Sequence, residues 1–183
     1  MAEPKSSGII GGWLGPGARL LQRHELFVAA SPDRAYDALL DARLGDMPIV
    51  RLLFVLRRIP HTKEMTLRRF TSTRPFMVLE EDAPREIVFG VAGGFLGSGA
   101  PRNEMLWTPE ELRVFAQDGG MRAIANFRVD AAQGGARLST ETWVETFGTG
   151  ARRLFALYWL LIGPFSALIR REFLRAARRA AET

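Results

Sequence analysis

The stretch GTGARRLFALYWLLIGPFSALIRREFLRAARRAAE, residues 148–182, decides the fold that this sequence predicts. After Gly150, only Gly163 and Pro164 interrupt some thirty residues of helix-forming sequence. On a wheel of 100° per residue, the spacing places apolar side chains on one face: Phe155, Ile162, Phe165, Ile169, Phe173, Ala176 and Ala180. Four arginines lie opposite: Arg171, Arg175, Arg178 and Arg179. We therefore expect one long C-terminal helix that packs on a sheet.

This helix is poorly suited to cross a membrane. The run from Leu154 to Ile169 is nearly all apolar, but a bilayer span needs about 20 such residues. Pro164 has no N–H to donate to the carbonyl of residue 160, so it should bend the helix. We expect protein to cover the first half on several sides, and the arginines at 170–179 to form a solvated face.

Upstream of the helix, short strands and helices alternate with turn residues. Ser31 followed by Pro32 is a strong helix start, because proline lacks only an N–H that would be unpaired there. Thr108 with Glu111 is a capping box. The patterns predict helices at 32–42, 48–58 and 109–117, and strands at 23–30, 65–71, 76–81, 86–92, 103–107, 122–129 and 136–147.

These elements predict one α+β domain over residues 20–182, preceded by a flexible leader over residues 1–19 in which Trp13 and Leu14 could dock on the body. A strongly curved antiparallel sheet wrapped around a long C-terminal helix, with two short helices after the first strand, leaves space between sheet and helix. Unless large side chains fill that space, it becomes a pocket.

Composition excludes several kinds of chemistry. The chain has no cysteine, so disulfides and thiolate metal sites are impossible; this is compatible with a reducing, cytoplasmic location. The two histidines, His24 and His61, are far apart and belong to no metal or triad motif, and we interpret both as solvated or hydrogen-bonded residues at strand ends. We expect no cofactor, no metal and no catalytic residue that a motif would identify.

The net charge of +5 is concentrated in the C-terminal helix. Residues 150–183 hold seven arginines against Glu172 and Glu182, whereas acidic and basic residues balance in the rest of the chain. No aromatic residues are interleaved with the arginines and no recognition motif accompanies them, so nucleic acid is not an expected partner. A weak contact with an anionic membrane through Arg171, Arg175, Arg178 and Arg179 is an alternative.

Several segments resemble the START-like superfamily, also called SRPBCC, and most of all its bacterial single-domain members. They are RHELFVAASPDRAYDALL (23–40), REIVFGVAGGFL (85–96), MRAIANFRV (121–129), LSTETWVETF (138–147) and YWLLIGPFSALIRREFLRAARRAAE (158–182). The superfamily includes polyketide cyclases, aromatases and lipid-transfer proteins. The resemblance implies a helix-grip fold with an internal cavity, but no catalytic motif, since members share the cavity and not one chemistry.

Candidate lining residues follow from strand alternation and the helix wheel. In the last strand Thr140 and Thr142 share the face of Leu138 and Val144, while Glu141 lies on the other face; if Glu141 pointed inward it would need an arginine partner. Asn126 could face either way. The candidates are Phe89, Trp107, Asn126, Thr140, Glu141, Thr142, Tyr158, Trp159, Ile162 and Phe165. Packing in an ordinary core is the alternative for each.

The function that these features favour is binding or carriage of a small hydrophobic molecule, such as a lipid, an isoprenoid or a polyketide-like aromatic. The alternative is a cyclase or aromatase that folds a polyketide-like substrate in the same cavity, with one or two polar side chains that move protons. The sequence shows no convergent acid–base set, so it favours binding over catalysis.

Overall fold

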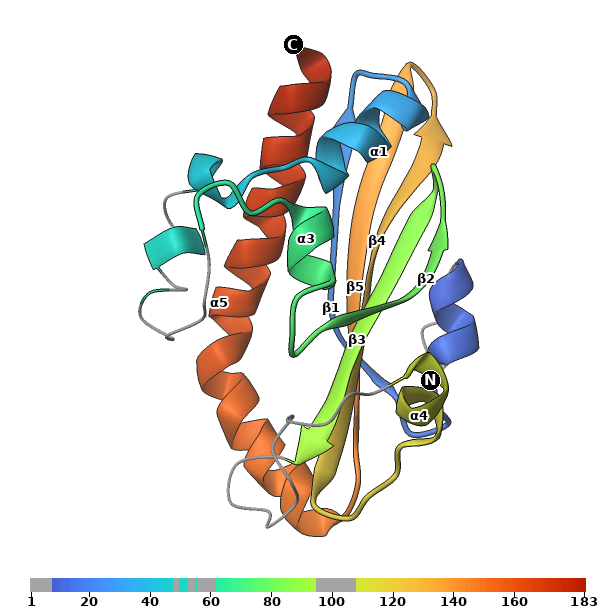
Figure 1. Ribbon diagram of the computed structural model, residues 1–183, viewed down its shortest axis with the longest axis vertical. Coiled ribbons are helices and arrows are strands. Elements are labelled where there is room, and N and C mark those ends of the chain that lie inside the picture. The colour runs from blue at the N-terminus through green and yellow to red at the C-terminus, as the bar shows by residue number, and fades with distance from the viewer. Residues whose placement is uncertain (1–7, 48–49, 53–54, 56–61, 95–107) are drawn as a thin grey trace.

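The computed structural model describes residues 8–47, 50–52, 55, 62–94 and 108–183. These residues form one antiparallel sheet with the strand order β1-β5-β4-β3-β2, crossed by a long helix (Figure 1). The elements are η1 (Ile9–Trp13), β1 (Arg19–Val28), α1 (Pro32–Leu40), η2 (Leu44–Asp46), α3 (Leu67–Thr71), β2 (Met77–Asp82), β3 (Glu86–Gly94), α4 (Pro109–Val114), β4 (Gly120–Ala132), β5 (Gly135–Thr146) and α5 (Thr149–Glu182).

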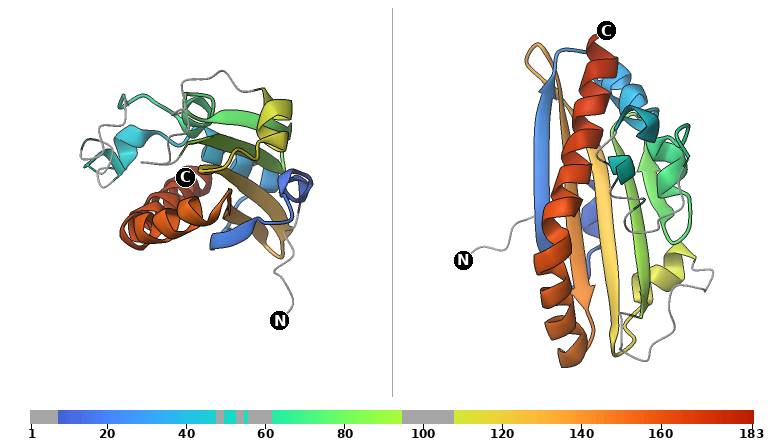
Figure 2. Two further views of the ribbon diagram at one scale, coloured as in Figure 1. Left: turned by 90° about the horizontal axis from the view of Figure 1, so that it is seen from below. Right: turned by 90° about the vertical axis from the view of Figure 1, so that its left-hand side faces the viewer.

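The long helix returns along the sheet because of a turn at Gly148. This residue has a φ of 90°, a conformation that side-chain-bearing residues rarely adopt, and it reverses the chain between β5 and α5. Helix α5 therefore runs antiparallel to β5 along one face of the sheet, and it is bowed rather than straight (Figures 1 and 2). We call this face the inner face. The arrangement is the α+β helix-grip architecture that the sequence predicted.

The inner face carries the main core. Alternate residues of β3, β4 and β5 point toward α5, and among them Phe89, Phe127 and Leu138 are buried. Phenylalanine rings connect sheet to helix: the centroids of Phe89 and Phe127 lie 6.0 Å apart, and those of Phe127 and Phe173 also lie 6.0 Å apart. Helix α1 adds Tyr36 and neighbouring apolar residues to this core. The C-terminal half of α5 is thus firmly held.

The outer face of the sheet is covered by η1 and α4 (Figure 2). Ile10 and Trp13 of η1 pack on Ile124 and other strand residues. Leu112 of α4 and Phe115, directly after this helix, belong to the same cluster. Residues 8–18 therefore lie against the sheet, and Trp13, for which docking was expected, is buried. The indole Nε1 of Trp13 also donates to Glu80 Oε2 over 2.7 Å.

Buried carboxylates hold this N-terminal segment in place. Glu86 accepts hydrogen bonds from the backbone N–H of Ile9 over 2.9 Å and from Asn126 Nδ2 over 2.7 Å. Glu145 accepts one from the N–H of Gly17 over 2.9 Å and forms an ion pair with the buried Arg122. Each carboxylate on this face thus has charged or polar partners, as buried charges require.

Two local predictions differ from the structure or lie outside it. The predicted strand at 65–71 is wrong: Thr66 caps helix α3 by accepting a hydrogen bond from the N–H of Arg69, so a cap signal was mistaken for β-propensity. The predicted capping box at Thr108 is confirmed. Of the predicted helix at 48–58, residues 50–52 and 55 are helical, and the predicted strand at 103–107 lies outside the described residues.

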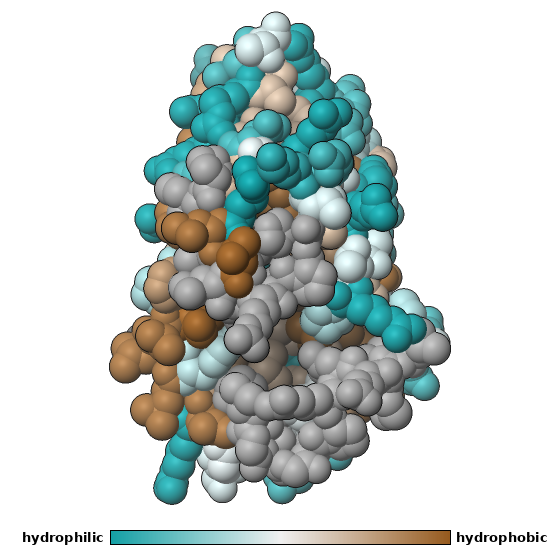
Figure 3. Space-filling model, turned by 60° about the vertical axis from the view of Figure 1, so that its left-hand side comes forward, coloured by the Kyte–Doolittle hydropathy of each residue, from teal (hydrophilic) through white to brown (hydrophobic). Residues whose placement is uncertain are grey.

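The first half of α5 is less covered than expected. Leu157, Leu160 and Leu161 are 69%, 78% and 68% exposed, and apolar residues gather over this part of the surface (Figure 3). The expectation of protein cover on several sides is wrong for this half, because the helix meets the sheet along one narrow strip. By length and composition α5 could span a membrane, yet its other half is packed on the sheet and α1.

The ring contacts that hold α5 on the sheet can be tested by removing one of them. Phe127→Ala should lower the free energy of unfolding by about 3–5 kcal/mol, because it leaves a cavity between β4 and α5. Leu160→Ala, at an exposed position on the same helix, should change it by less than about 0.5 kcal/mol. Urea denaturation followed by circular dichroism measures both, and equal losses would contradict this account of the core.

Candidate functional site

Four polar side chains form a block on the inner face where β1 and β5 pair. Gln22 lies opposite Thr142, and His24 lies opposite Thr140, in the antiparallel register of the two strands. A register shift between Leu20 and Gln22 precedes the block. Side chains that face each other across such a pair lie about 5 Å apart at their Cβ atoms. The structure therefore gathers four polar groups beneath α5, in a face that is otherwise apolar.

Arg170 of α5 points into this region. Its Nη1 donates to Thr140 Oγ1 over 2.7 Å, and its guanidinium lies 5.9 Å and 5.7 Å from the ring centroids of Phe89 and Phe127. The Nε atom is buried and has no hydrogen-bond partner. Among the described residues no ion pair involves Arg170. Burial lowers the pKa of Arg170 to about 10, so the group stays charged at neutral pH.

His24 lies beside this cation. Arg171 Nε donates to His24 Nδ1 over 3.4 Å, which leaves the proton of the neutral ring on Nε2. That Nε2 atom is buried without a partner. Burial lowers the pKa of His24 below its ordinary value, and the charges of Arg171 and Arg170 lower it further. At neutral pH His24 is therefore an uncharged donor with its N–H unused.

Two further polar atoms of the block are also unpaired. Gln22 Nε2 donates to the carbonyl of Gly163 over 2.6 Å, beside Pro164 in α5, but Gln22 Oε1 is buried without a partner. The same is true of Thr142 Oγ1. Buried polar atoms in folded proteins are almost always hydrogen-bonded, so four unpaired ones in a single region require an explanation. We call Gln22, His24, Thr140, Thr142 and Arg170 the inner polar cluster.

Aromatic residues extend the region along α5. Because α5 runs antiparallel to β5, the first turns of the helix lie near the end of β5, where Phe155 packs on Val144. Phe155 stacks on Trp159 at 5.8 Å between centroids and lies 6.1 Å from Tyr158. The inner face beneath α5 thus has an aromatic end at Phe155–Trp159 and a cationic end at Arg170, with the polar block between them.

Five of the ten predicted lining residues lie along this inner face. Phe89, Thr140 and Thr142 are buried on the strands, and Tyr158 and Trp159 are partly buried on α5. Ile162 is partly buried, and Phe165 is 36% exposed. Trp107 lies outside the described residues.

Asn126 and Glu141 do not belong to this region, which corrects their placement in a cavity. Both lie on the outer face, because alternation along β4 and β5 turns them away from α5. The backbone N–H of Glu141 donates to Asn126 Oδ1 over 2.7 Å, and the carboxylate of Glu141 pairs with Arg23 at 2.7 Å. The arginine partner that Glu141 requires thus comes from β1 and not from α5.

Arg170, His24 and Gln22 are site residues that the sequence patterns did not predict. Arg170 was grouped with a solvated arginine face, yet it lies three and four residues before Phe173 and Leu174, both buried. That spacing places Arg170 on the packed side of α5, so the helical period of the sequence could have predicted its orientation. His24 lies in the middle of β1 and not at a strand end, and it shares a face with Leu26 and Val28.

The arginines proposed for membrane contact are partly used within the fold. Arg171 donates to His24, and Arg175 forms an ion pair with Glu172 at 2.7 Å between nitrogen and oxygen. Arg178 is partly buried and Arg179 is exposed. The structure offers no support for a membrane contact through these four side chains.

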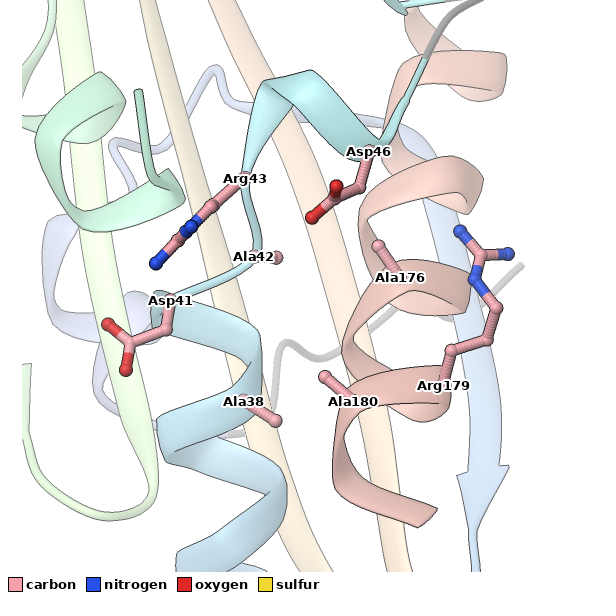
Figure 4. A pocket seen from close by; sticks show the side chains of 8 residues that line it. All are labelled: Ala38, Asp41, Ala42, Arg43, Asp46, Ala176, Arg179 and Ala180. Atoms are coloured by element: carbon pink, nitrogen blue, oxygen red, sulfur yellow. The ribbon is translucent and has the colours of Figure 1, made fainter. Parts of the chain in front are cut away.

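A hollow of about 430 Å³ opens elsewhere on the surface, between α1, η2 and the end of α5. Its lining combines alanine methyl groups with exposed charged side chains (Figure 4): Ala38, Asp41, Ala42, Arg43, Asp46, Ala176, Arg179 and Ala180. None of the buried unpaired atoms lies here, and the charged groups are all in contact with solvent. We therefore place the candidate site at the inner polar cluster. In the described ranges, no three His, Asp or Glu side chains lie close enough to share a metal ion.

Comparison with known proteins gives only distant likenesses. No family model matches the sequence, and no curated protein matches it. Among solved structures, the di-domain ARO/CYC protein StfQ of the steffimycin biosynthetic pathway aligns over 88% of this chain and 50% of its own, at 15% identity and a TM-score of 0.38. The chain thus spans about half of StfQ. Ara h 8.0201 aligns over 90% of this chain and 98% of its own, at 9% identity and a TM-score of 0.32.

The state of His24 predicts a pH dependence of stability. Its folded pKa lies below 6.5 and the unfolded pKa near 6.5, so the unfolded chain binds the extra proton first as the pH falls. The contribution of His24 is therefore complete above about pH 6.5 and is lost progressively below it. His24→Gln should remove this part of the pH dependence, measured by urea denaturation between pH 7 and 5. An NMR titration that gives His24 a pKa above 6.5 would contradict the assignment.

Proposed function

We propose that the protein binds a small hydrophobic molecule between the inner face of the sheet and α5. The observation that carries the proposal is the set of buried, unpaired polar atoms in a wall that is otherwise aromatic and aliphatic. Ligand sites have this composition: mostly apolar surface, with a few polar groups that orient the ligand. A carrier in the cytoplasm, working without a metal or a cofactor, is the form of this function that we favour.

The shape of α5 supports access to this site. Its C-terminal half is fixed by Phe173 and Leu174 in the core, whereas its first half contacts the sheet mainly through Phe155 and the partly buried Tyr158 and Trp159. The exposed leucines of the same half provide apolar surface beside the proposed entrance. We expect an apolar molecule to enter and leave the site there without disturbing the packed C-terminal half of the helix.

The state of His24 favours binding over cyclase-type catalysis. A general base must offer a lone pair to the substrate, but the Nδ1 lone pair of His24 already accepts from Arg171. Glu86, Glu141 and Glu145, the buried carboxylates of the sheet, face the other side and are paired there. The groups beneath α5 are thus mainly donors, which hold a ligand but do not remove its protons.

A substitution that fills the space beneath α5 tests the proposal. Ala123 faces α5 from β4, opposite Val144, and packs in the cluster of Phe155. Ala123→Phe should weaken binding of the neutral dye Nile red at least about tenfold, because its ring occupies the ligand's volume. Ala131→Phe, at the exposed end of the same strand, is the matched control and should bind like the natural protein.

Native mass spectrometry of the protein purified from cells, followed by organic extraction, provides an independent measurement. We expect a co-purified apolar molecule that is displaced by Nile red and that is depleted in Ala123→Phe. Failure to carry any apolar molecule, together with failure to bind the dye, would overturn the proposed function.

A further inference from the structure

Arg170 is a partly buried cation whose Nε atom is fully enclosed, and no carboxylate among the described residues pairs with it. Its contacts are one hydroxyl, that of Thr140, and the faces of two phenylalanine rings. Removal of a charge from water costs several kcal/mol unless a counter-charge compensates it. Of the other buried charges of the described residues, Arg122 pairs with Glu145 and Glu141 pairs with Arg23, while Glu86 accepts hydrogen bonds from Asn126 and from backbone N–H groups. Arg170 departs from this pattern.

In the part of the chain that the structure describes, the groups around Arg170 supply no negative charge. Its pKa is lowered by burial alone, with no carboxylate to raise it. His24, on the neighbouring strand, is neutral, and Arg171, which donates to it, is exposed to solvent. The free hydrogen-bond donors in this region are Arg170 Nε–H, His24 Nε2–H and the hydroxyl of Thr142. Together they form a set of donors with a net positive potential.

We infer that the ligand of the proposed site is an apolar molecule with one carboxylate, which Arg170 binds by charge-assisted hydrogen bonds while the hydrocarbon part lies along Phe155, Tyr158 and Trp159. This inference rests on the proposed function and specifies its substrate class. A carboxylate offers two acceptor oxygens and matches the planar guanidinium. Its single negative charge balances the single buried cation, whereas the second charge of a phosphate monoester would remain uncompensated.

The length of the region fits an elongated acid. Trp159 and Arg170 are eleven helical steps apart, and at 1.5 Å per step this separates the two ends by roughly 16 Å. A saturated chain of about twelve carbons has a similar extended length. Gln22 and Thr142 lie between the ends, so their unpaired atoms could contact a second polar substituent along such a chain.

The test compares ligands that differ only in the head group. Dodecanoate, dodecanol and dodecyl phosphate compete against Nile red on the full chain at pH 7. We expect dodecanoate to bind about tenfold or more tightly than dodecanol, and dodecyl phosphate to bind less tightly than dodecanoate. Arg170→Met should abolish the preference for the acid and leave the affinity for dodecanol within about twofold. Arg179→Met, on the exposed side of the helix, should retain the preference.

Stability separates a ligand-binding role from a structural one. Replacement of an uncompensated buried charge by an apolar side chain of similar length is often neutral or stabilising, so Arg170→Met without ligand should unfold at an equal or higher urea concentration. Marked destabilisation would show that Arg170 serves the fold and would overturn the inference. Equal affinity for acid and alcohol, or tighter binding of the phosphate, would also overturn it while leaving the proposed function intact. If none of the three compounds binds, the proposed function fails as well.

Discussion

The contact between Phe127 of β4 and Phe173 of α5 determines how the rest of the molecule is arranged. It joins the C-terminal half of the long helix to the middle of the sheet, where Phe70 and Phe89 extend the same group of rings. Because the helix is bowed and the sheet is curved, tight packing along one half leaves the other half in contact through a narrow strip. The candidate site lies between the packed half and the aromatic residues of the first turns.

Charged side chains have different partners on the two faces of the sheet. On the outer face, Glu86, Glu141 and Glu145 are buried together with arginines, an asparagine and the backbone N–H groups of the N-terminal segment. These networks are satisfied internally, and they fasten η1 to the sheet. On the inner face, the partly buried Arg170 lies among phenylalanine rings and donors. Paired charges stabilise a fold, whereas an unpaired charge is free to pair with an oppositely charged group of a ligand.

Much of the architecture could be predicted from local patterns. The helical period after Gly148, the cap at Ser31 and the capping box at Thr108 are signals between residues close in sequence, and the structure contains each of them. The candidate site could be predicted only in part. Thr140 and Thr142 lie on the face that strand alternation with Leu138 and Val144 predicted, and their role as lining residues stays a prediction. For Asn126 the alternation left two faces open, since nothing in β4 alone shows which face meets the helix.

The sequence by itself therefore determined the elements, their order and the amphipathic character of α5, because these depend on spacings of two to four residues along the chain. Tertiary structure alone decided that Glu141 pairs with Arg23 on the outer face and that Arg170 has no carboxylate partner within the described ranges. The sequence does not show whether a charged side chain contacts solvent, a counter-ion or an aromatic ring. Its role depends on which distant strands pack against it, and only the folded chain brings those strands together.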